Sequence, residues 1–140
     1  MGVRVQVVFD AADPHVLSRF WAAALRYDCE DHSELVGQLH TAGRLTDEEV
    51  VEVDGRRAFR DVAACTDPEG IGPRLFFQRV PEPKTGKNRV HLDLHAGPQD
   101  AASEVERLRA LGATVAWTTC DRSPLTTTML DPEGNELCVN

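Results

Sequence analysis

Residues Asn88–His95 read Asn-Arg-Val-His-Leu-Asp-Leu-His, and apolar and polar side chains alternate along this stretch. Successive side chains of a β-strand point to opposite faces of a sheet, so the alternation predicts a strand with one apolar and one polar face. The polar face would carry His91, Asp93 and His95. Two imidazoles flanking a carboxylate indicate a chemical site, although an ordinary amphipathic sheet edge would show the same alternation.

A related stretch, Val3–Asp10, lies 85 positions earlier in the chain. In this alignment Gln6 falls on His91 and Val8 falls on Asp93, and both stretches lead through a Pro-containing turn into a helical pattern. The tetrapeptide Asp-Pro-Glu-Gly also occurs twice, at residues 67–70 and 131–134, each time before a final strand. The chain is therefore predicted to contain two copies of one β-α-β-β-β module.

The repeat predicts the domain organisation. The first module spans residues 1–80 and has an extra helix near residues 31–43, a polar, turn-rich linker follows at 81–87, and the second module spans 88–140. Asp13 and Pro14 have the residue types of an N-cap and a first helical position. Asp54-Gly55 predicts a hairpin between strands at 50–53 and 58–64. In the second module, strands are expected at 114–119, 125–130 and 135–139, with a turn at Asp121–Pro124.

The composition limits the classes of partner. The 140 residues include 15 Lys and Arg against 23 Asp and Glu, a formal charge of −8, so neither nucleic acid nor an anionic membrane surface is an expected partner. No apolar run approaches the roughly 20 residues of a membrane helix, and the first residues lack a signal-peptide layout, which predicts a cytoplasmic protein. The four cysteines are scattered without a C-x-x-C pair, which favours reduced thiols.

The stretches Lys87–Leu94 and Asp131–Val139, within two β-α-β-β-β modules, resemble the glyoxalase/bleomycin-resistance/extradiol-dioxygenase superfamily, also called vicinal oxygen chelate. Within it, the chain is similar to glyoxalase-like domain proteins of actinobacterial type. The resemblance implies an α+β fold in which two βαβββ modules form an open, cup-shaped mixed sheet with helices on the outer face. It also implies a homodimer.

The resemblance further implies a site for one divalent metal, held by side chains from the first and last strands of each module. The positions that correspond here are Gln6, His91 and Glu136. Ile71-Gly72-Pro73 breaks the register after the first Asp-Pro-Glu-Gly, so the fourth position is assigned to Gln78, the polar acceptor of the last strand of the first module. Imidazole, carboxylate and amide ligands suit Zn²⁺, Ni²⁺, Mn²⁺, Fe²⁺ or Co²⁺. The alternative role of Gln6, His91 and Glu136 is that of ordinary hydrogen-bonded side chains of the cup, and the alternative for Gln78 is a surface residue on an edge strand.

The remaining candidate residues concern catalysis and substrate binding. Glu136 or Asp93 would act as the base, and His95 would face the substrate. Phe76, Phe77 and Trp117 would form an apolar pocket wall or pack in the core.

Three functions are compatible with these residues. The leading hypothesis is a small-molecule lyase or isomerase in which the metal stabilises an enediolate-type intermediate. The alternative is a metal-free protein that binds a small molecule of antibiotic type in the same cup. A dimeric module without a small ligand is the third.

Overall fold

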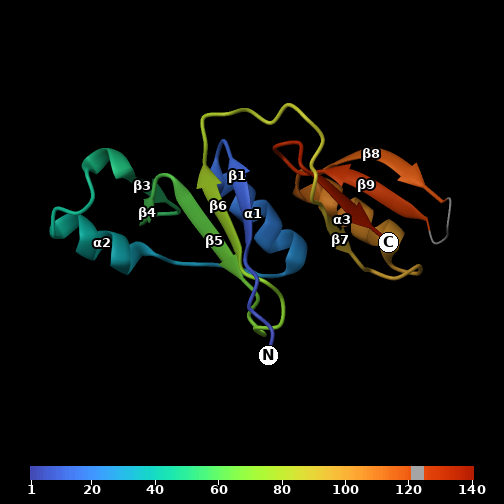
Figure 1. Ribbon diagram of the computed structural model, residues 1–140, viewed down its shortest axis with the longest axis horizontal. Helices are drawn as coiled ribbons and strands as arrows, with labels where there is room; N and C mark the ends of the chain where they lie inside the picture. Colours follow the sequence, from blue (N-terminus) through green and yellow to red (C-terminus); the bar gives the residue numbers. More distant parts are fainter. Residues whose placement is uncertain (121–124) are drawn as a thin grey trace. The chain divides into compact units, whose positions relative to one another are not determined.

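The computed structural model describes residues 1–120 and 125–140, and the chain divides into two compact units, Met1–Pro81 and Glu82–Asn140 (Figure 1). Each unit is described by itself. The turn predicted at Asp121–Pro124 lies outside the described residues. None of the described helices is both long and apolar enough to cross a membrane.

Unit 1 is built on a four-stranded sheet with the strand order β1-β6-β5-β2. β1 runs parallel to β6, whereas β6 with β5 and β5 with β2 are antiparallel pairs. A separate hairpin consists of β3 and β4. In chain order the elements are β1 (Val7–Ala11), α1 (Pro14–Leu25), β2 (Asp28–Cys29), α2 (Ser33–Thr41), a 3-10 turn (Asp47–Glu49), β3 (Val50–Val53), β4 (Arg56–Phe59), β5 (Val62–Thr66) and β6 (Leu75–Arg79).

Unit 2 repeats the four-stranded sheet in the order β7-β10-β9-β8. β7 and β10 are parallel, and the other two pairs are antiparallel, as in unit 1. Its elements are β7 (Leu92–Leu94), α3 (Ala101–Leu111), β8 (Thr114–Thr119), β9 (Thr126–Leu130) and β10 (Glu136–Val139). β1, β2, β5 and β6 are therefore the counterparts of β7, β8, β9 and β10. The predicted α+β class with two β-α-β-β-β copies is confirmed.

The insertion in unit 1 is larger than the sequence predicts. The strand that follows α1 in the module is the two-residue β2, and both α2 and the β3–β4 hairpin lie between it and β5. The hairpin loop itself is as expected, with Asp54 at φ 51° and Gly55 at φ 76°, the positive values that a tight two-residue loop requires. A strand as short as Asp28–Cys29 shows no alternating pattern, so the sequence does not reveal it. The sequence pattern therefore placed the hairpin strands in the main sheet, which is wrong.

One helix covers the apolar face of the sheet in each unit. In unit 1 the Asp13 side chain accepts hydrogen bonds from the N–H groups of His15 and Val16, which confirms the predicted N-cap of α1. The helix packs on β5 and β6 (Figure 1). Its Leu17 and Trp21 are buried. In unit 2, α3 ends at Gly112, whose φ of 117° suits glycine, and buries Leu108 completely. These helices leave the opposite face of each sheet for polar side chains.

The repeated Asp-Pro-Glu-Gly turns have the same structure in both units. The side chains of Asp67 and Asp131 accept hydrogen bonds from the N–H groups of Glu69 and Glu133, at 2.9 and 2.8 Å. The chain then differs, because residues 71–73 separate the first turn from Arg74, whereas Asn135 alone separates the second turn from β10. The two extra residues shift the register of β6 relative to β10.

The strand predicted from Asn88 to His95 is shorter than expected. β7 includes only residues 92–94, and a bend at Arg89 and Val90 precedes it. Val90 is 77% exposed and does not reach the core, in contrast to the prediction of a continuous apolar face.

Candidate functional site

The polar face of unit 2 is formed by the side chains of β7 and β10 that point away from α3. Cys138 lies beside Asp93 in the parallel pairing, and Leu137 lies beside Leu92 with its side chain in the core. Extending this register by one residue at either end adds His91 with Glu136 and His95 with Asn140.

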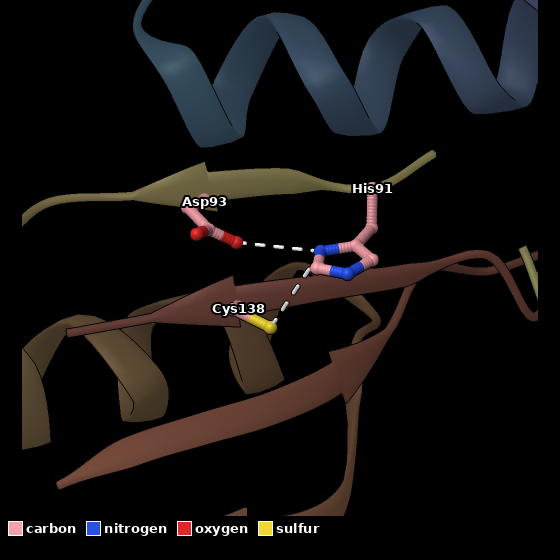
Figure 2. A group of neighbouring side chains, drawn as sticks. All are labelled: His91, Asp93 and Cys138. Atoms are coloured by element: carbon pink, nitrogen blue, oxygen red, sulfur yellow. Dashed lines mark hydrogen bonds and ion pairs between the residues drawn. The ribbon is translucent and has the colours of Figure 1, made fainter. Parts of the chain in front are cut away.

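Three side chains of this face converge (Figure 2). His91 Nδ1 lies 3.3 Å from Asp93 Oδ1 and 3.9 Å from Cys138 Sγ. One ligand-type atom from each residue lies within 4.8 Å of the others. The side chains of His91 and Asp93 are 39% and 46% exposed, whereas Cys138 is buried. The cluster is therefore accessible from one side and closed by the sheet on the other.

Glu136 is buried in the same face but has different partners. Its carboxylate accepts a hydrogen bond of 3.0 Å from the N–H of Asn88, and Lys84 Nζ lies 3.7 Å away. Burial acts to raise the pKa of Glu136, but the Asn88 hydrogen bond and the charges of Lys84 and Lys87 outweigh it and leave the pKa below its usual value. Glu136 is thus an anionic carboxylate at neutral pH.

The other predicted residues of unit 2 lie at both sides of this cluster. His95 Nδ1 is 2.6 Å from Asn140 Oδ1, a contact that orients the imidazole at the far end of β7. Trp117 is 44% exposed and lies opposite Thr128 in the β8–β9 pairing. The Thr128 hydroxyl in turn lies 3.5 Å from Cys138 Sγ, so Trp117 shares the face of the cluster.

The polar face of unit 1 is organised by Arg74. Its Nε and Nη2 donate hydrogen bonds of 2.6 and 2.8 Å to the two carboxylate oxygens of Glu30, and its Nη1 donates one of 2.9 Å to Gln6 Oε1. The guanidinium also lies 5.4 Å from the ring centroid of Phe76. Such a two-point pairing fixes the guanidinium in one orientation.

Glu30 is the acceptor at the centre of this network. Besides Arg74, it accepts a hydrogen bond from the Thr66 hydroxyl and lies 3.0 Å from His32 Nε2. The hydrogen bonds from Arg74 are the largest influence and, despite partial burial, lower the pKa of Glu30 to about 2. Unit 1 therefore holds a persistent ion pair on its polar face.

The predicted ligands of unit 1 are not brought together. The register of β1 and β6 extends to place Gln6 beside Arg74, while Gln78 pairs with Asp10 and donates a 2.9 Å hydrogen bond to its carboxylate. Gln78 is four residues beyond Arg74 on β6, or about 13 Å at 3.3 Å per residue.

Phe77 lies on the opposite face of β6 from this network. It is fully buried and stacks on Phe9 at 5.2 Å, so it belongs to the core beneath α1. Phe76 is the aromatic residue of β6 that lies on the polar face, beside Arg74.

The family of the chain follows from a sequence comparison. A family described as "Glyoxalase-like domain" matches residues 6–140. The chain belongs to the glyoxalase-like domain family. No match was found among the curated proteins.

Solved structures share the fold of this glyoxalase-like domain. A glyoxalase/bleomycin resistance protein/dioxygenase family enzyme from Burkholderia phytofirmans has a TM-score of 0.63 and 13% identity, covering 96% of this chain and 94% of that chain. A fosfomycin resistance protein from Mesorhizobium loti has a TM-score of 0.65 and 10% identity, covering 100% and 91%. A mutant of the fosfomycin resistance protein from Listeria monocytogenes, complexed with Mn(II) and a dihydroxypropylphosphonic acid, has a TM-score of 0.62 and 8% identity, covering 100% and 90%. The predicted superfamily resemblance is confirmed.

The two units of the glyoxalase-like domain differ in the ligands that they offer to a divalent ion. In unit 2, imidazole, carboxylate and thiol donors converge, a set that suits Zn²⁺ or Co²⁺. In unit 1, the oxygen of Gln6 is engaged by Arg74, and a guanidinium occupies the position that corresponds to Glu136. The predicted set of Gln6, Gln78, His91 and Glu136 takes two residues from each unit. Gln6 and Gln78 lie apart within unit 1, and a metal site that combines residues of both units stays a prediction.

The sequence prediction did not include three residues of these faces. Cys138 shares the polar face with Glu136 by simple alternation along β10, a relation that the sequence pattern contains. Arg74 could have been found by aligning β6 with β10 directly instead of through the preceding turns. Glu30 gave no signal, because it contacts Arg74 across 44 positions of sequence.

Proposed function

We propose that this protein is a small-molecule lyase or isomerase that uses a divalent metal held in unit 2 by His91, Asp93 and Cys138. The proposal rests on one observation, the convergence of three ligand-type atoms within 4.8 Å on the accessible polar face. A thiol with an imidazole and a carboxylate favours Zn²⁺ or Co²⁺ over the harder Mn²⁺ among the ions expected from the sequence. The complex of the Listeria fosfomycin resistance protein with Mn(II) supports metal chemistry on this fold.

The residues around the cluster have separate roles in this proposal. A bound ion would supply a Lewis acid for a substrate with two neighbouring oxygens. Glu136 lies on the same face of β10, is ionised at neutral pH and is not part of the three-residue cluster. It is therefore the proposed base that takes a proton from the substrate, while Asp93 serves as a ligand. Trp117 and His95 would contact the rest of the substrate from the two sides of the cluster.

A metal-free binding protein is the second candidate, and the Arg74 network favours it. Arg74 places a fixed cation where the repeat has Glu136, and it removes Gln6 from the set of free ligands. Arg74 and Phe76 together offer a charged and aromatic surface to a small molecule of antibiotic type without any metal. In both candidates the homodimer implied by the superfamily stays a prediction, which light scattering of the purified protein tests.

Metal titration separates the two candidates. The protein is stripped with a chelator and titrated with Zn²⁺ by calorimetry and with Co²⁺ by absorption spectroscopy. The metal-dependent proposal expects one equivalent of bound ion and, with Co²⁺, a thiolate-to-metal charge-transfer band. Both His91→Ala and Cys138→Ser should abolish the band. His40→Ala and Cys29→Ser are matched controls on unit 1 and should leave it intact. Absence of saturable binding by the parent protein would favour the metal-free candidate.

A further inference from the structure

Two cysteines of unit 1 face each other across adjacent strands. Cys29 on β2 lies directly opposite Cys65 on β5 in an antiparallel pair. Directly opposite residues of such a pair point to the same face of the sheet, with Cβ atoms about 4.5–5.5 Å apart. Both thiols are free, and Cys29 is exposed while Cys65 is buried.

The hydrogen-bond pattern defines which kind of pair they form. The N–H of Glu30 donates to the carbonyl of Ala64 at 2.9 Å, and these two residues are the next opposite pair along the strands. Hydrogen-bonded and non-hydrogen-bonded pairs alternate, so Cys29 and Cys65 form a non-hydrogen-bonded pair, whose Cα atoms are typically about 4.5 Å apart. That separation lies at the short end of the range of about 4.4–6.8 Å that disulfides span. The two-residue edge strand β2 can make the small adjustment that the Cβ atoms need.

Reagents can reach this pair from one side. Cys29 lines a cavity of about 350 Å³ between β2, β5, the β3–β4 hairpin and the start of α1. Burial raises the pKa of the Cys65 thiol to about 12, with a further contribution from the nearby Cys29. Cys29 is therefore the thiol that reacts first.

We propose that Cys29 and Cys65 form a redox-active pair that a low-molecular-weight disulfide oxidises to a disulfide bond between β2 and β5. The Cys29 thiolate attacks one sulfur of the reagent, whose S–S bond breaks and releases one small thiolate. The Cys65 sulfur then attacks the Cys29 sulfur and releases the second small thiolate, which takes up the proton of the Cys65 thiol. The two protein thiols lose two electrons, which reduce the reagent to two thiols. The new bond fixes β2 immediately before Glu30, the residue that pairs with Arg74.

Oxidised glutathione is a suitable probe. The reduced protein is incubated with it, free thiols are blocked with N-ethylmaleimide, and peptides are mapped by mass spectrometry without reduction. The expected product is a Cys29–Cys65 linked peptide in the monomeric chain, with Cys138 blocked by the maleimide after unfolding. Cys120→Ser, which removes the other exposed cysteine, should not change this product.

Substitutions of Cys29 and Cys65 separate the first thiol–disulfide exchange from the second. Cys65→Ala should stop at a stable mixed disulfide on Cys29, and Cys29→Ser should leave Cys65 unmodified in the folded protein. Because Cys65→Ala can weaken folding, the parent protein provides a second measurement: oxidation should raise its melting temperature, and dithiothreitol should reverse the rise. A stable glutathione adduct on Cys29 of the parent protein, or a Cys29–Cys120 link, would overturn the proposal.

Discussion

Removing the Glu30 carboxylate by Glu30→Gln should destabilise unit 1 in a pH-dependent way. The pKa of Glu30 falls from 4.5 to about 2 on folding, which corresponds to about 3 kcal/mol at roughly 1.4 kcal/mol per pKa unit. The Arg74 side chain is 36% exposed and that of Glu30 23%, so solvent screening reduces the expected loss to about 1–2 kcal/mol. Because the folded-state pKa is lowered, this stability is fully present above pH 4.5 and disappears as the pH falls toward 2.

Urea unfolding measures this effect through Trp21, which is buried in α1 of unit 1. A Trp117→Phe background removes the fluorescence of unit 2, so that the transition reports unit 1. The gap between Glu30→Gln and its parent should be largest at pH 7 and smaller at pH 3. Glu69→Gln is the matched control, because it makes the same change at an exposed carboxylate of the same unit. An equal gap at both pH values, or no gap at pH 7, would refute the assignment of the ion pair.

Three further predictions concern local structure and metal binding. Asp13→Ala should cost about 1 kcal/mol by removing the N-cap of α1, whereas Asp100→Ala should cost little, because no side-chain cap is present at α3. In Gly72→Ala the new Cβ would clash with Tyr27 Oη. We therefore expect a loss of about 1–3 kcal/mol of unfolding free energy, which Tyr27→Phe partly relieves in a double-mutant cycle. Binding of Zn²⁺ should release protons as Cys138 ionises, so its affinity should rise with pH, as calorimetry in buffers of different ionisation enthalpy would show.

The sequence was sufficient for the plan of the fold because the repeat leaves strong local signals. The polar alternation of residues 91–95, the N-cap at Asp13 and the loop at Asp54-Gly55 each depend on neighbouring residues, and each is found in the structure. The lengths of the strands were harder to predict. The bend at Val90 shortens β7, and nothing in the apolar character of Val90 indicates that it is exposed.

The site was harder to predict because it depends on register. Two more residues separate the first Asp-Pro-Glu-Gly turn from Arg74 than separate the second turn from Glu136. An alignment of the two modules through these turns therefore does not pair Arg74 with Glu136. Gln78 was chosen instead because it is a polar acceptor on the strand. Strand pairing corrects this, since Val7 lies beside Leu75 as Leu92 lies beside Leu137. A one-residue change of register exchanges the two faces of a strand, so Phe76 and Phe77 cannot be assigned without the pairing.

The remaining contacts of the two polar faces join residues that are far apart in the sequence. Glu30 reaches Arg74, and His91 reaches Cys138, across more than forty positions of sequence. Only the folded sheets bring such pairs together, so no local pattern could predict them.

The most direct test of the proposed metal site is anomalous diffraction at the zinc absorption edge from crystals grown with Zn²⁺. We predict one strong anomalous peak within about 2.0–2.3 Å of His91 Nδ1, an Asp93 carboxylate oxygen and Cys138 Sγ. A peak that instead lies beside Glu136 without Cys138, or no peak on the polar face of unit 2, would contradict it.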